Sequence, residues 1–160
     1  MDVQRDPGNS VGFLIADSSR MLRRVFNERL TPLGLTQAQW RALVHLSLNE
    51  GLNQVSLAER LEVQPMTAAR LIDKLAAAGF VERRPDPNDR RAQRLFLTEL
   101  ATPIIDQIWE IADKMYADIF AGFSAAEHDA LVKALTHMRS NLATLMPGAT
   151  VESGNLVQTN

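Results

Sequence analysis

Residues 54–98, QVSLAERLEVQPMTAARLIDKLAAAGFVERRPDPNDRRAQRLFLT, predict two successive helices followed by a β-hairpin. Ser56 and Glu59 have the spacing of a capping box, so we expect the first helix to begin at Ser56. Pro65 suits the first turn of the second helix, where the missing proline N–H costs nothing, and Gly79 suits its C-terminal end. Apolar residues recur at helical spacing and predict the buried face of this helix: Ala68, Leu71, Ile72 and Leu75.

The opposite face of the second helix is mostly polar or basic. It carries Gln64, Met66, Thr67, Arg70 and Lys74. Such side chains can reach base edges and phosphates in a major groove, and two helices joined by a tight turn are the helix-turn-helix arrangement. An ordinary helical pair with a solvated basic face has the same pattern, and Met66 suits a core position as well as a DNA contact.

A hairpin with arginines at its tip follows the second helix. Residues 80–84 and 94–98 predict two short strands, and the residues between them are rich in proline, asparagine and aspartate, which favour turns. Five arginines lie between positions 83 and 94. Because a narrow minor groove favours arginine, we interpret the hairpin as a DNA-binding wing. A solvated surface charge is the alternative for each arginine taken alone.

The run DPNDRRAQRLFLTE, placed after L-x-x-x-G-F-V-x-R, resembles the wing of MarR-type winged-helix regulators. LTQAQW near residue 35 and LTELATPII near residue 97 resemble the SlyA branch of that family, and the similarity extends over roughly residues 11–146. The resemblance implies a mainly α fold with a small two- or three-stranded β wing. In a single domain, 1–160, it implies a DNA-binding lobe at 35–98 and dimerisation helices at 10–34 and 99–146.

The resemblance also implies separate roles within the wing. Arg91 matches the position that enters the minor groove, and Asp89 matches the acidic residue that braces it. We expect Arg90 and Arg94 to meet phosphates, and we include Arg84 in the same DNA-binding wing.

A pocket for a small aromatic carboxylate or phenolic effector is a further implication of the resemblance. Four residues offer a cation and flat apolar or polar surfaces for its lining: Arg20, Trp40, His45 and Trp109. The resemblance would put a histidine at position 44, where this chain has Val44. Plain core positions for both tryptophans are the alternative.

Charge is unevenly distributed along the chain. Residues 60–98 hold eight basic and five acidic groups, whereas residues 99–160 hold three basic and eight acidic groups, although the net charge is only −2. Positive charge is therefore concentrated where the DNA contacts are expected. The absence of cysteine excludes disulfides and zinc-thiolate sites. No apolar run is long enough to span a membrane and MDVQRDPGNS is polar, so we expect a cytoplasmic, nucleoid-associated protein.

Two other classes of protein, an enzyme and a helical protein-interaction module, fit the sequence less well. His45, His128 and His137 lack the spacing of a zinc protease, and no nucleotide-binding glycine pattern occurs, so we expect no catalytic residue, no metal and no cofactor. We assign Asp86 and Asp89 to turn and salt-bridge roles rather than to a metal site. A helical protein-interaction module would explain the apolar helix after the hairpin, but it would not explain the arginines.

Further capping signals outline the rest of the chain. Thr36 with Gln39 and Ser124 with Glu127 predict two more helix starts, and we expect Thr98 to cap a long helix through about residue 120. Residues 147–160 are expected to form a flexible tail. Together with the MarR resemblance, which implies the dimer and the repressor or anti-silencer role, the sequence predicts a transcriptional regulator that binds double-stranded DNA as a homodimer at a pseudo-palindromic operator.

Overall fold

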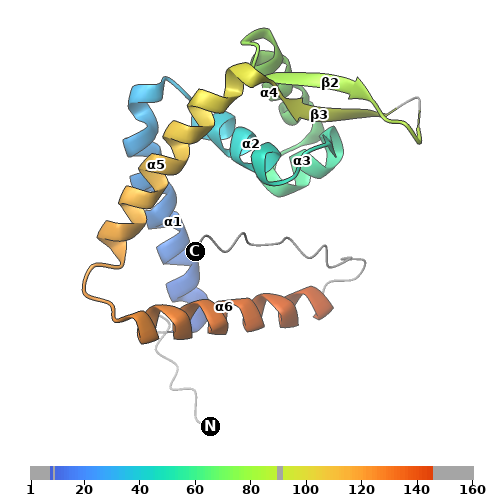
Figure 1. Cartoon of the computed structure of the whole chain (residues 1–160). Coiled ribbons are helices and arrows are strands. Elements are labelled where there is room, and N and C mark those ends of the chain that lie inside the picture. The colour runs from blue at the N-terminus through green and yellow to red at the C-terminus, as the bar shows by residue number, and fades with distance from the viewer. Residues whose placement is uncertain (1–7, 9, 90–91, 146–160) are drawn as a thin grey trace. The chain divides into compact units, whose positions relative to one another are not determined.

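The computed structural model describes residues 8, 10–89 and 92–145, and the chain divides into one unit that ends at Tyr116 and another that begins at Ala117. The helices are α1 (Val11–Leu30), α2 (Gln37–Leu48), α3 (Gln54–Leu61), α4 (Pro65–Ala77), α5 (Thr102–Ile119) and α6 (Ala125–Leu145), with short 3-10 helices at Thr31–Leu33 and Glu99–Ala101. The strands are β1 (Leu52–Asn53), β2 (Val81–Pro85) and β3 (Gln93–Leu97). This order confirms the predicted mainly α fold with a small β wing (Figure 1).

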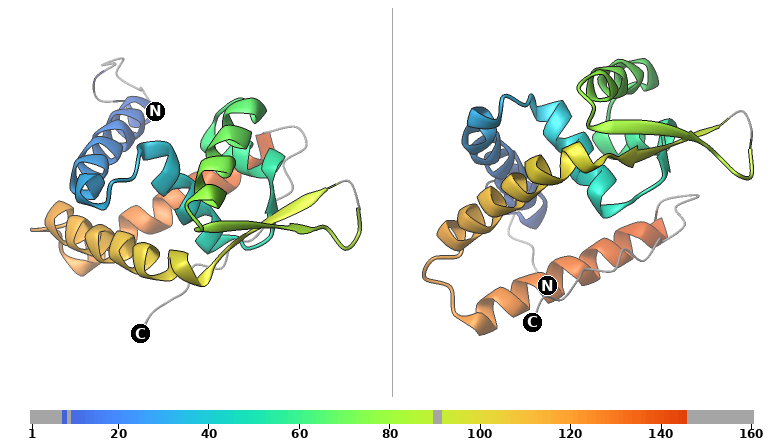
Figure 2. Two further views of the ribbon diagram at one scale, coloured as in Figure 1. Left: turned by 90° about the horizontal axis from the view of Figure 1, so that it is seen from above. Right: turned by 45° about the horizontal axis from the view of Figure 1, so that its top comes forward.

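The three strands form an antiparallel sheet in the order β1, β3, β2. Val81 and Leu95 are buried and anchor the base of the β2–β3 hairpin, whereas β2 is exposed from Arg83 onward. Apolar side chains hold only one end of the hairpin, so its other end projects beyond α2, α3 and α4 (Figures 1 and 2). The two-residue strand β1 adds a third strand at the base of this hairpin.

The core of the first unit fixes the orientation of α4. Ala68, Leu71, Ile72 and Leu75 of α4 are buried, as the helical spacing predicted. They belong to a region whose other fully buried side chains come from neighbouring elements, among them Leu30, Leu43, Leu46, Leu57, Leu61 and Ile108. Because one face of α4 is held inside, its other face must point to solvent.

Two predicted helix starts are wrong. The helix expected at Ser56 is α3, which begins at Gln54, and the Asn53 side chain caps it by accepting a hydrogen bond of 2.8 Å from the Ser56 N–H. Asn53 is itself a strong capping residue, and its pairing with Arg94 in the sheet holds it in the extended conformation that a cap needs.

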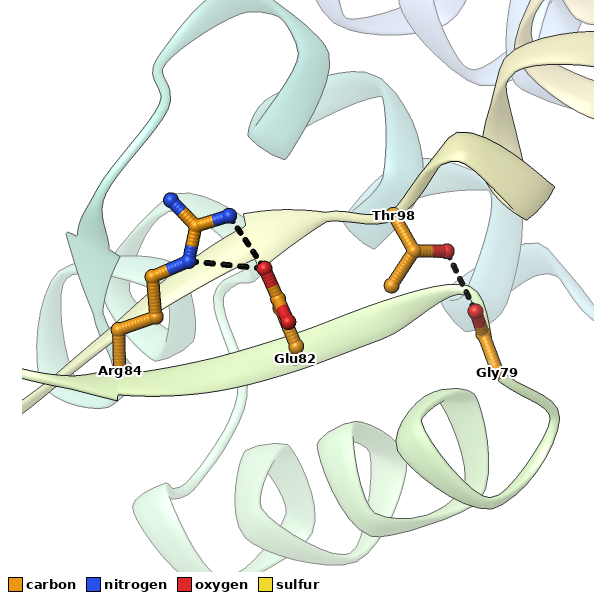
Figure 3. Close-up of polar contacts among 4 residues, drawn as sticks. All are labelled: Gly79, Glu82, Arg84 and Thr98. Carbon is orange, nitrogen blue, oxygen red and sulfur yellow. Dashed lines mark hydrogen bonds and ion pairs between the residues drawn. The ribbon is translucent and has the colours of Figure 1, made fainter.

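Thr98 does not cap a long helix. Its hydroxyl donates a hydrogen bond to the Gly79 carbonyl instead, and a short 3-10 helix separates it from α5, which begins at Thr102 (Figure 3). The boxes predicted at Thr36 and Ser124 are confirmed, because both side chains accept from the residue three positions on.

The second unit contains α6, which has no buried residue among those described. Its exposed large apolar side chains are Leu131, Val132, Leu135, Leu142 and Leu145. A helix that leaves so much apolar surface in water is suited to packing against another molecule. Among the residues that the structure describes, no helix is long and apolar enough to cross a membrane.

Candidate nucleic-acid interface

The outward face of α4 is the first part of the candidate site. All five residues predicted to face DNA, namely Gln64, Met66, Thr67, Arg70 and Lys74, are exposed. Met66 is 67% exposed, so it is not a core residue. Neither Arg70 nor Lys74 pairs with a carboxylate among the described residues, so both cations are available to an anionic partner.

The wing is the second part, and an ion pair organises it. The Asp86 carboxylate accepts a hydrogen bond of 2.7 Å from Arg94 Nε and one of 2.8 Å from the Asn88 N–H. The hydrogen bond from Arg94, followed by that from Asn88, holds the pKa of Asp86 below its ordinary value. Asp86 therefore has the turn and salt-bridge role predicted for it, and it joins the two strands near the tip of the hairpin.

Two further arginines of β2 are also held by neighbours. The Arg84 guanidinium lies over the Phe96 ring, 4.3 Å from its centroid, and it pairs with Glu82 (Figure 3). Arg83 Nη2 lies 2.6 Å from Asp73 Oδ1, so this pair links β2 to α4. No sequence pattern predicts the Arg83–Asp73 pair, because its members are ten residues apart in different elements.

The tip of the wing is described only in part. Asp89 is exposed, and its carbonyl accepts a hydrogen bond of 3.0 Å from the Ala92 N–H. Arg90 and Arg91 lie outside the described residues, so the expected minor-groove contact of Arg91 stays a prediction.

A cavity of about 260 Å³ lies among α1, α2 and α5 of the first unit. It is lined by Leu22, Arg23, Phe26, Trp40, Val44, Ile108, Trp109, Ala112, Met115 and Tyr116. Trp40 is 7% exposed and packs edge-on against Phe26, whereas Trp109 is 38% exposed. The cavity thus combines apolar walls and four aromatic rings, two of them from tryptophans, with one cation, which comes from Arg23.

The structure does not bring all four predicted pocket residues together. Arg20 pairs with Asp17 at 2.5 Å and lines a separate depression on the surface of α1. His45 lines neither the cavity nor the depression. Its partial burial, followed by the positive charges of Arg41 and Arg60, lowers the pKa of its imidazole. Arg23 was missed, although it lies between Leu22 and Phe26 on the same helix as Arg20.

Within residues 8, 10–89 and 92–145, no group of three histidine, aspartate or glutamate side chains is placed to hold an ion.

A helix-turn-helix whose second helix faces outward, followed by a basic β-hairpin, defines a winged-helix protein. The chain belongs to the MarR family of transcriptional regulators, whose family model matches residues 35–92. Transcriptional regulator PA3341, which has a crystal structure, is 34% identical in sequence to this chain, and the two structures match with a TM-score of 0.76. The match covers 84% of this chain and 99% of PA3341. A MarR transcriptional regulator from Methanosarcina mazei Go1 is 29% identical, with a TM-score of 0.74 and coverages of 85% and 98%. The apo form of wild-type MarR from E. coli is 28% identical, with a TM-score of 0.71 and coverages of 81% and 96%.

Proposed function

We propose that this regulator binds double-stranded DNA sequence-specifically, with α4 in the major groove and the wing beside it. The outward face of α4 carries the proposal, because it combines two uncommitted cations with hydrogen-bonding groups on a helix whose other face is locked in the core. Arg70 and Lys74 supply positive charge, and Gln64 and Thr67 can hydrogen bond to bases. The wing would extend the contact, with Arg91 in the minor groove and Arg90 at a DNA phosphate.

We further propose that the active form is a homodimer built from residues 10–34 and 99–146, with residues 35–98 as its DNA-binding lobe. The exposed apolar side chains of α6 support this, as do exposed apolar residues on α1 such as Phe13, Leu14 and Met21. A two-fold dimer presents two copies of α4, which fits a pseudo-palindromic operator with half-sites about one helical turn apart. The predicted tail, 147–160, lies outside the described residues.

The test is a selection of duplex fragments by the purified full chain, followed by binding and light-scattering measurements. The expected result is an enriched palindromic motif, bound by a dimer, with an affinity that falls by about 10³–10⁵ between about 50 and about 200 mM salt. A stable dimer that binds no duplex would instead favour a protein-interaction module. Transcription from a promoter that carries the motif would then show whether binding represses the promoter or relieves its silencing. Both outcomes assume a cytoplasmic protein that acts at the nucleoid.

A small aromatic acid or phenol is the effector class that the cavity supports best. The rings of Trp40 and Trp109 offer flat surfaces, and Arg23 offers a cation for a carboxylate. Because the lining includes Val44 of α2 as well as residues of α1 and α5, a bound ligand can bias how the DNA-binding lobe is held. Coupling of this kind is typically worth a 5–150-fold change in DNA affinity.

Salicylate is a suitable probe for this second proposal. We expect it to quench tryptophan fluorescence, to do so less in Trp40→Phe, and to lower the affinity for DNA. Arg23→Gln should weaken salicylate more than a neutral phenol, whereas Arg20→Gln is a matched control, because Arg20 lies outside the cavity. Saturable quenching without a change in DNA affinity would show a binding pocket that is not coupled to DNA. If no member of a panel of aromatic acids quenches the fluorescence, both tryptophans are core residues and do not bind a ligand.

A further inference from the structure

The first turn of α4 is completed by backbone groups alone. The N–H groups of Thr67 and Ala68 both donate to the Gln64 carbonyl, at 2.9 and 3.1 Å, and Pro65 has no N–H to satisfy. No side-chain cap hydrogen bond is formed at Gln64. The side chains of this turn are therefore not needed to begin the helix.

Met66 lies outside the core to which α4 contributes. It is 67% exposed, whereas the four core residues of α4 are 0–7% exposed. The nearby residues Gln64, Thr67 and Arg70 are exposed and polar. Met66 is therefore an apolar side chain within the proposed DNA-contacting face. A methionine side chain is flexible and polarizable, which allows it to adapt to a small apolar partner.

In the major groove, the small apolar group that distinguishes one base from the others is the 5-methyl of thymine. Residues near the N-terminus of a recognition helix are those that face base edges, and Met66 is the second residue of α4. We propose that Met66 is a specificity-determining residue that packs on a thymine methyl in each half-site. The inference rests on the proposed DNA binding, and it adds the base that this position selects.

The experiment removes the methyl group from DNA and the side chain from the protein, separately and together. A duplex is first selected from a random library by the full chain. In a series of variants of this duplex, deoxyuridine then replaces thymine at a single half-site position, and each variant carries the replacement in both half-sites. At one such position the wild type should lose about fourfold in affinity per half-site, because the free energy gained by burying one methyl group corresponds to about a fourfold change in affinity. Met66→Ala should bind the thymine and deoxyuridine duplexes equally, and Met66→Leu should restore most of the difference.

Two controls separate this contact from a general loss of binding. Gln64→Ala changes a neighbouring exposed side chain and should leave the thymine-to-deoxyuridine ratio at its wild-type value. Met66→Ala should unfold at the wild-type temperature, because the side chain is mainly exposed. The proposal is overturned if the selected half-site contains no thymine, or if Met66→Ala keeps the wild-type ratio at every position. These results leave the proposed function intact, whereas a chain that binds no duplex at all would overturn both.

Discussion

Removing Arg70 and removing Arg94 should weaken DNA binding in two different ways. Arg70 is exposed on α4 and has no carboxylate partner among the described residues, whereas Arg94 is 38% exposed and donates to the Asp86 carboxylate at 2.7 Å. The sequence assigned both arginines to DNA. We therefore expect Arg70 to meet the nucleic acid directly, and Arg94, whose charge is paired with that of Asp86, to stabilise the wing.

Salt dependence distinguishes these roles. A cation that neutralises one phosphate contributes about 0.9 to the slope of log K against log salt, so Arg70→Gln in both subunits should reduce that slope by about 1.8. From about 50 to about 200 mM salt, the variant should therefore lose about 12-fold less affinity than the wild type. Should Arg70 pair with a guanine instead, the variant would also lose preference at that base, a difference of about 1–3 kcal/mol.

Arg94→Gln should lower affinity at every salt concentration and leave the slope within about 0.5 of the wild-type value, because its charge is already paired. Fluorescence anisotropy with one labelled operator duplex, titrated at four salt concentrations, measures both effects. Asp86→Asn combined with Arg94→Gln is the matched control, because it removes the pair without changing the net charge of the wing. An Arg94→Gln slope that changes as much as that of Arg70→Gln would refute the reasoning and show that the ion pair opens on DNA.

Three other predictions concern the wing, a turn and a half-buried imidazole. Arg91→Ala should cost the most affinity where the flanks are A·T-rich, and Asp89→Ala should reproduce part of that loss by freeing the arginine; binding assays that find Asp89→Ala harmless would contradict the bracing role. Gly79 has a φ of 79°, so Gly79→Ala should lower the free energy of unfolding by about 1–2 kcal/mol and Tm by about 2–8 °C, as measured by thermal unfolding. His45 has a lowered pKa in the folded chain, so below about pH 6.5 the unfolded chain binds the extra proton more readily. Stability should therefore fall as the pH drops below that value, and His45→Gln should flatten this part of the curve in denaturant titrations.

Much of the fold follows from local signals in the sequence. Pro65 and Gly79 sit at the ends predicted for α4, because the N–H that proline lacks and the left-handed φ that glycine tolerates matter only within a turn. The buried face of α4 was likewise predicted in full, since helical spacing alone decides which side chains share a face. The exposure of Gln64, Thr67 and Arg70 follows from the same prediction, because these residues lie on the opposite face of the helix.

Other features depend on residues that only folding brings together. Helix α3 begins at Gln54 rather than at Ser56, because its capping residue is Asn53, which pairs with β3 some forty positions later in the sequence. Whether an arginine faces DNA or a carboxylate of its own chain depends on pairs across strands and helices, such as Arg94 with Asp86 and Arg83 with Asp73. Spacing along α1 likewise cannot choose between Arg20 and Arg23 for the cavity, because that choice depends on how α1 is rotated against α2 and α5, which the packing of the core sets.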